Sequence, residues 1–281
     1  MNSQEIMQLA LDMVGFDGIP ADSAIQVPGK DMKRVLFGID IGVPELLLAK
    51  ELKVDGVIAH HPIGLNISPI YDKHIDQMAS FGIPREVGEK AVAPIKEGTN
   101  LSFLSGNFDH VVSVARVLGL PLMNIHNPLD EVGRRVMDEA IKARRQAVEG
   151  TGAGEGAGQG RTFTVGDVVD ALQGIPEFSR VPTRPQIMVG KAENPAGKVA
   201  VAHAAGTNGR YAVANAYYEH GVSTVVYIHV DAPGLAKLRA ENKGNLVVAG
   251  HIVADAVGIN PFIDLLREKG MEVITISGCG L

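Results

Sequence analysis

The sequence has 281 residues, of which 46% are hydrophobic and 21% are charged, a composition that is ordinary for a globular protein. Its formal net charge of −6 provides no overall basic field that would hold nucleic acid or an anionic membrane. The single cysteine, Cys279, excludes an internal disulfide. No apolar stretch reaches the ~18 residues of a membrane span and no signal-peptide pattern is visible, so we expect a cytoplasmic protein.

Helical and strand patterns alternate along the first half of the chain. Ser3 is a candidate N-cap for a helix that carries Ile6, Leu9 and Met13 on one face and stops at Gly15. Buried strands are predicted at 35–41, 54–59 and 121–125. Further helices are predicted at 44–52, 71–80, 84–96, 109–118 and 131–147.

A glycine-rich run from 149 to 160 interrupts this alternation. Glycine-rich loops can bind dinucleotides, but such a loop follows a strand and opens a helix, whereas this run follows a predicted helix. We interpret 149–162 as a flexible linker or an exposed loop. The sequence then divides into an N-terminal lobe, 1–148, and a C-terminal lobe, 163–281.

The alternation resumes in the C-terminal lobe. Helices are predicted at 164–173, 210–219, 232–241 and 252–269, with Gly258 and Pro261 as candidate break points in the last. Strands are predicted at 186–190, 198–203, 223–230, 245–249 and 271–276. This order indicates an α/β protein with two lobes, each a sheet flanked by helices, and a metal site between them.

The first candidate metal segment follows the strand at 54–59, where the chain continues as His60-His61-Pro62. Open α/β sheets place ligand sites at the carboxyl ends of their strands. Adjacent histidines on an extended strand point to opposite faces, but both can turn towards one cavity if the strand ends before the proline. The alternative is two unrelated loop histidines.

The second and third segments share the spacing His-x-x-x-Asp after a predicted strand. They are His126 to Asp130 and His251 to Asp255. Imidazole and carboxylate groups suit borderline divalent metals. Asp130 is also a candidate helix cap after an Asx-type turn, and Asp255 is also a candidate for stabilisation by a helix dipole, so neither segment is decisive alone.

Together, the three segments resemble the NIF-three-like family, whose bacterial members are often labelled GTP cyclohydrolase I type 2 homologs. That family has a strand ending in His-His-Pro, then His-Thr-x-x-Asp, and near the C-terminus Gly-His-x-x-x-Glu. The resemblance covers most of the chain. It departs from the pattern at Asn127, where the family has threonine, and at Asp255, where it has the longer glutamate.

The resemblance implies two divalent metal ions and a homo-oligomer, often a hexamer. Zinc, manganese, iron, cobalt and nickel all accept histidine and carboxylate ligands, so the sequence does not identify the metal. The implied ligands are His60, His61, Asp130, His251 and Asp255. His126 is implied as an additional ligand or as a partner of one. Asp109 competes with Asp130 as the middle ligand, but Asp130 is preferred because a strand precedes it and the His-x-x-x-Asp spacing is intact there.

Two further histidines, His203 and His229, lie near the carboxyl ends of predicted strands. Either is a candidate proton carrier lining the cavity. The remaining histidines, His74, His110 and His220, carry no suggestive context.

Two metals held by histidines and carboxylates suit hydrolysis, because one ion lowers the pKa of bound water from 15.7 to about 7 and the other polarises the substrate. The expected function is therefore a hydrolase of a small molecule such as a nucleotide, including opening of the guanine ring of GTP, or phosphoester or amide hydrolysis. The alternative is a metal-binding interaction or regulatory protein without turnover. Neither a membrane nor nucleic acid is an expected partner.

Overall fold

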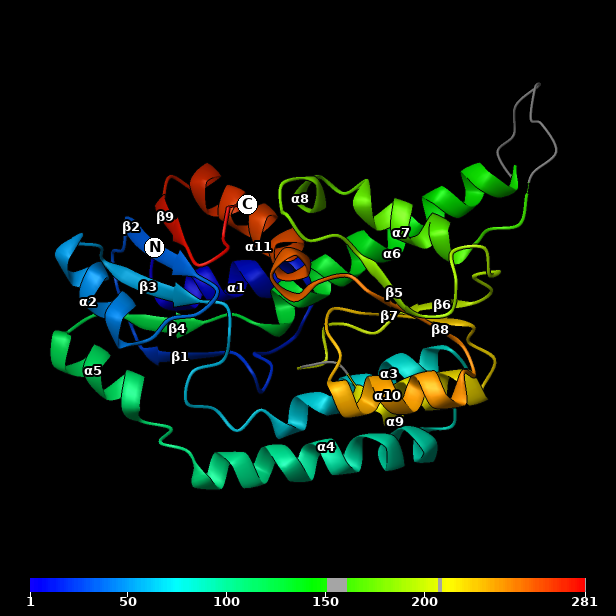
Figure 1. Ribbon diagram of the computed structural model, residues 1–281. Coiled ribbons are helices and arrows are strands. Elements are labelled where there is room, and N and C mark those ends of the chain that lie inside the picture. The colour runs from blue at the N-terminus through cyan, green and yellow to red at the C-terminus, as the bar shows by residue number, and fades with distance from the viewer. Residues whose placement is uncertain (151–160, 207–208, 281) are drawn as a thin grey trace. The chain divides into compact units, whose positions relative to one another are not determined.

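The computed structural model describes residues 1–150, 161–206 and 209–280 (Figure 1). These residues form two compact units. Unit 1 comprises Met1–Tyr71, Ile95–Gly133 and Asp255–Leu281, and unit 2 comprises Asp72–Pro94 and Arg134–Ala254. Each unit therefore takes segments from both of the lobes, 1–148 and 163–281, that the sequence suggests. The linker expected at 149–162 falls largely on 151–160, which lie outside the described residues.

Unit 1 contains a sheet with the strand order β1-β4-β3-β2-β9. Its strands are β1 (Ala24–Val27), β2 (Arg34–Gly38), β3 (Gly56–Ala59), β4 (Leu122–Asn124) and β9 (Glu272–Ile276). β1 pairs antiparallel with β4, whereas the other neighbours are parallel. The last strand of the chain thus joins the sheet that the first strands begin, beside β2.

The two faces of this sheet carry separate hydrophobic cores, because successive side chains of a strand point to opposite faces. Val35 and Phe37 of β2 pack in one core, together with residues of α1 and the C-terminal part of α11. Leu36 of β2 packs in the other, against residues of α2 and α5. Because helices cover both faces of the sheet, the run Val35–Phe37 of β2 and the whole of β3 are apolar rather than alternating.

Most helices with residues in unit 1 lie close to their predicted positions, and one short 3-10 helix was not predicted. They are α1 (Ser3–Val14), α2 (Val43–Glu51), the 3-10 helix η1 (Ser68–Tyr71), α5 (His110–Leu118), the start of α6 (Asn127–Glu149) and most of α11 (His251–Glu268).

Two details of these helices differ from the sequence prediction. The cap of α1 is Asn2 rather than Ser3, since the Asn2 side chain accepts from the backbone N–H of Glu5 and the Glu5 carboxylate accepts in return. The helix α11 runs without interruption through Gly258 and Pro261, so neither of these candidate break points interrupts it.

Unit 2 contains a sheet with the order β5-β8-β7-β6. Its strands are β5 (Gln186–Val189), β6 (Val199–Val201), β7 (Thr224–Tyr227) and β8 (Asn245–Val248). Its helices are α3 (Asp72–Ser80), α7 (Val165–Gln173), α8 (Pro176–Ser179), α9 (Arg210–Glu219) and α10 (Ala232–Glu241). α4 (Arg85–Ser105) has residues in both units.

The first four strands of the unit 1 sheet have the same topology as the four strands of the unit 2 sheet. In each, the first strand is antiparallel to the fourth, and the fourth, third and second follow in parallel order. β4 leads into α6 and β8 leads into α11 (Figure 1). The two His-x-x-x-Asp segments therefore occupy equivalent places, each at the start of the helix that follows the fourth strand of its sheet.

The mixed α/β architecture with two sheets flanked by helices confirms the predicted fold class. The sequence prediction missed β1, η1 and α8, which are short, and placed the end of α4 too early at residue 96. Among the helices of the described residues, none has the length and apolar character needed to cross a membrane.

Candidate metal centre

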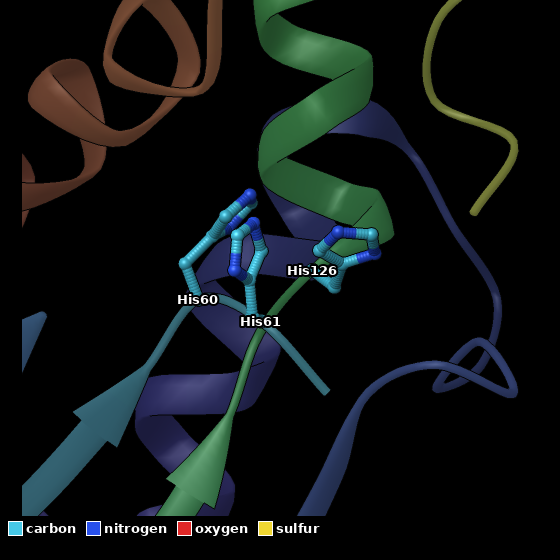
Figure 2. Close-up of side chains that lie close together, drawn as sticks. All are labelled: His60, His61 and His126. Atoms are coloured by element: carbon cyan, nitrogen blue, oxygen red, sulfur yellow. The ribbon is translucent and has the colours of Figure 1, made fainter. Parts of the chain in front are cut away.

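Three histidines meet at the carboxyl edge of the unit 1 sheet. His60 and His61 follow β3, and His126 follows the neighbouring strand β4 (Figure 2). The ring centroids of His60 and His126 lie 4.7 Å apart, those of His60 and His61 5.4 Å apart, and those of His61 and His126 5.8 Å apart. Parallel pairing of β3 with β4 brings these two chain ends together, as the rule for open α/β sheets predicts.

The backbone explains how adjacent histidines face the same region. The N–H of His60 donates to Gly38 O and that of His61 donates to Ile39 O, both at 2.9 Å, so the chain stays tied to the end of β2. The backbone bends at both histidines instead of continuing as a strand. The bend removes the alternation of an extended strand, and the His61 ring lies beside those of His60 and His126 (Figure 2).

Two buried carboxylates face the histidines. His60 Nε2 lies 3.1 Å from Asp130 Oδ1 and 3.8 Å from Asp255 Oδ2. His61 Nε2 lies 3.4 Å from Asp255 Oδ2, and His126 Nε2 lies 3.7 Å from Asp130 Oδ2. Asp130 lies in the first turn of α6 with its N–H bonded to His126 O, so it belongs to the helix proper rather than preceding it as a cap.

A close crossing of α6 and α11 brings the two carboxylates together. A Cβ atom added to Gly258 would lie 1.9 Å from Leu129 O and 3.0 Å from the backbone nitrogen of Gly133. Only glycine permits this approach between helix backbones. Leu129 directly precedes Asp130, and Gly258 lies one turn after Asp255, so the crossing sets the separation of the two acids.

The Nδ1 atom of each histidine has its own hydrogen-bond partner on the far side of the ring. His60 Nδ1 lies 3.0 Å from Ile125 O, His61 Nδ1 lies 2.7 Å from Asp40 Oδ1, and His126 Nδ1 lies 2.7 Å from Asp22 Oδ2. A carbonyl or carboxylate oxygen only accepts, so Nδ1 is the donor in all three rings. In the neutral rings the lone pair is then on Nε2, which is the atom directed at the carboxylates.

These atoms fit a divalent cation. His60 Nε2 is buried without a hydrogen-bond partner among the described residues, yet it lies within 3.1 Å of a carboxylate oxygen. Two electron-rich atoms at this distance need either a proton or a cation between them. Histidines that donate Nδ1–H to a carbonyl or carboxylate and present Nε2 are the usual arrangement of metal-binding histidines. The buried histidine and aspartate groups can therefore bind metal ions.

The electrostatics of the site also favour a positive charge beside the histidines. Burial lowers the pKa of His126, but the carboxylates of Asp130 and Asp22 outweigh it and raise that pKa to about 9. Burial also lowers the pKa of His61, while hydrogen bonds to Asp255 and Asp40 raise it, and the net direction is upward. The acids thus attract positive charge to the histidine side of the site, in the form of a proton or of a metal ion.

This chain matches known proteins among the solved structures. No family model and no curated protein matches the sequence. Among solved structures, a NIF3 superfamily protein from Sphaerobacter thermophilus is 44% identical, with a TM-score of 0.92, and the match covers 99% of this chain and 98% of that one. This chain belongs to the NIF3 superfamily. The match confirms the resemblance noted in the sequence.

More distant structures share the fold of the superfamily alone. Reduced HcgD from Methanocaldococcus jannaschii is 15% identical with a TM-score of 0.59, over 98% of this chain and 97% of that one. A Bacillus cereus protein related to NIF3 is 12% identical with a TM-score of 0.53, over 98% of this chain and 96% of that one.

The remaining site residues predicted for this NIF3 superfamily protein lie in unit 2. His251 opens α11, one turn before Asp255, and its ring centroid lies 4.9 Å from that of His229. His203 follows β6 and is buried, and its carbonyl accepts from the Gln77 side chain. The competing ligand Asp109, which belongs to unit 1, is half exposed and pairs with Arg116 at 2.8 Å.

Asp22 and Asp40 were not among the site residues expected from the sequence. Asp40 follows β2 by two residues, so the rule that strand ends carry ligand sites could have found it. Asp22 precedes β1, a strand that was itself not predicted, and no pattern in the sequence points to it.

Proposed function

We propose that this NIF3 superfamily protein is a divalent-metal-dependent hydrolase of a small molecule, such as a nucleotide, with two ions per chain. The observation that carries the proposal is the set of three Nδ1-anchored histidines whose Nε2 atoms face two buried carboxylates. The proposed ligands are His60, His61, His126, Asp130, His251 and Asp255.

The proposed ligands differ in how deeply their side chains are buried. The side chains of His60, Asp130 and Asp255 are at most 4% exposed, so they hold an ion away from solvent. The His61 side chain is 23% exposed and marks the side from which a substrate can enter. Divalent ions held here supply an acidic water and polarise a substrate oxygen. Opening of the GTP ring, phosphoester hydrolysis and amide hydrolysis all use this chemistry.

His229 and His203 are proposed as proton carriers for the same reaction. The ring contact between His229 and His251 supports this role for His229, because it lies beside a proposed ligand. The burial of His203 at the end of β6 supports a position close to the sheet edge where ligands bind. Replacing either histidine with glutamine is expected to lower turnover while leaving metal content unchanged.

Elemental analysis followed by a hydrolysis screen tests the proposal. The wild-type protein is expected to carry about two ions per chain, and a His60→Ala/His251→Ala variant to lose most of them. The metal-loaded protein is then screened against nucleoside triphosphates, phosphoesters and amides. Asp130→Asn is expected to abolish turnover in a protein that still unfolds cooperatively. Absence of bound metal after reconstitution with zinc and with manganese would refute the metal site.

The burial of the cluster favours a second candidate, a metal-binding regulatory protein without turnover. The His60 and His126 side chains are 0% and 7% exposed, which suits retention of an ion more than rapid exchange of substrate. A metal-loaded protein that hydrolyses nothing in the screen but forms a stable complex would support this candidate over the hydrolase.

Self-association is proposed with either function, as a homo-oligomer such as a hexamer. Several large apolar side chains of unit 1 are exposed, and such surfaces commonly mark protein interfaces. They include Leu101, Leu104, Phe108 and Val117. Light scattering during gel filtration measures the assembly directly, and a monomer at micromolar concentration would contradict it.

A further inference from the structure

Asp22 is a fully buried carboxylate next to the proposed metal centre. It lies in unit 1 just before β1 and is 0% exposed. Burying a carboxylate is costly unless it is paired and hydrogen-bonded. Its closest charged or polar side-chain contact is His126, with 2.7 Å between Asp22 Oδ2 and His126 Nδ1. The other oxygen makes only a long contact of 3.4 Å with Ser23 Oγ.

The segment that carries Asp22 also holds the backbone around His126. Ser23 Oγ accepts from the His126 N–H at 2.9 Å. The carbonyl of Asp22 accepts from Asn124 Nδ2 at 2.7 Å, and Asn124 Oδ1 accepts from Gln26 Nε2 at 2.7 Å. Residues 22–23 therefore fix His126 at its main chain, at its ring and through its neighbour in β4. These contacts restrict the orientation of the His126 ring.

We propose that Asp22 is a positioning residue that makes His126 a direct metal ligand through Nε2, an inference that rests on the proposed metal site. The Asp22 carboxylate holds the hydrogen on Nδ1, so that in the neutral ring, the form that binds a metal, the lone pair is on Nε2. That atom faces Asp130 Oδ2 at 3.7 Å. A separation of this size accommodates an ion bound by both atoms. This assigns the role of His126 that the sequence left open.

Asp40 provides a matched comparison within the same protein. It makes the same 2.7 Å contact to Nδ1 of His61, but its side chain is 68% exposed, whereas that of Asp22 is 0% exposed. Water can replace an exposed acceptor at little cost, and it has no access to the position of Asp22. Loss of the Asp22 carboxylate should therefore weaken metal binding much more than loss of Asp40.

The test compares Asp22→Asn with Asp40→Asn in the full-length protein. Zinc affinity is measured by competition with a chromophoric chelator, and zinc content by elemental analysis. Partners that orient metal-binding histidines typically contribute 10–100-fold to affinity. Asp22→Asn is expected to lower the affinity for one zinc ion by about this factor. Asp40→Asn is expected to lower it by only a few-fold. Equal, small effects of the two substitutions would overturn the proposal.

A double-mutant cycle separates positioning from general damage. If Asp22 acts through His126, Asp22→Asn has no further effect on zinc affinity in a His126→Ala background. A further loss of 10-fold or more in that background would overturn the proposal. Thermal unfolding of each metal-free variant shows whether the fold is retained.

A measurement on the wild-type protein covers the case in which the variants do not fold. In the cobalt-substituted protein, each histidine bound through Nε2 gives a strongly shifted, solvent-exchangeable Nδ1–H proton signal in the NMR spectrum. A signal assigned to His126 supports the proposal, and its absence while His60 gives one refutes it. If wild-type protein binds no metal at all, the proposed function fails instead, and that outcome is distinct from every outcome above.

Discussion

Replacing Gly258 with alanine tests whether the crossing of α6 and α11 sets the geometry of the metal centre. The new Cβ would lie 1.9 Å from Leu129 O, about 1.5 Å closer than the 3.4 Å at which ordinary contact begins. The obstacle is helix backbone, so α6 and α11 must move apart. Overpacking of this kind costs about 1–3 kcal/mol, against a gain of up to ~1 kcal/mol from the better helix propensity of alanine.

We expect Gly258→Ala to lower the melting temperature of the metal-free protein by several degrees, at about 2–4 °C for each kcal/mol. We also expect weaker zinc binding, because the shift separates Asp130 from Asp255 and functional sites tolerate only about 0.5 Å of displacement. Calorimetry and chelator competition measure the two effects.

Gly98→Ala is the matched control for this substitution. It also places alanine inside a helix, α4, but its Cβ would meet nothing within 4 Å. The control is expected to be neutral or slightly stabilising and to leave zinc affinity unchanged. If Gly258→Ala is as stable as Gly98→Ala and binds zinc as the wild type does, the crossing does not control the site.

The ionisable groups lead to three further predictions. The pKa of His126 in the metal-free protein is about 9, compared with 6.5 for a free histidine. The charged His126 ring therefore contributes its full stabilisation below pH 6.5, and this contribution is lost as the pH rises through 9. In denaturant titrations at several pH values, His126→Gln should remove that part of the pH dependence of the unfolding free energy. Asp167 of α7 pairs with Arg161 and bonds to the N-cap Thr164, and these contacts hold its pKa well below the usual value of 3.8. Asp167→Ala should cost about 1–3 kcal/mol at neutral pH, and the difference from wild type should begin to shrink as the pH falls below 3.8 and continue to shrink as the carboxylate of the folded protein is protonated. Burial, with the nearby carboxylates of Asp255 and Asp40, raises the pKa of the Cys279 thiol to about 12. Native protein should therefore react slowly with iodoacetamide at pH 8 and rapidly in denaturant, and fast native labelling would contradict its burial.

The sequence alone determined which strands are buried and which polar residues come directly after them. Apolar runs ending in His60-His61 and in His126 predicted histidines at the carboxyl edge of a sheet, because parallel strands buried on both faces are apolar throughout and their ends are marked by polar residues. The spacing from His126 to Asp130 similarly predicted a carboxylate in the first turn of the following helix. These are local relations, and local patterns suffice to find them.

Only the tertiary structure decided which residues meet across long separations in the chain. Asp22 and His126 are in contact although they are 104 residues apart in the sequence. Asp255 approaches His60 because α11 crosses α6 at Gly258. The strand β9 joins the first sheet rather than the second, so the compact units do not follow chain order. No periodicity records such contacts, because they depend on how the elements pack and not on what each element is.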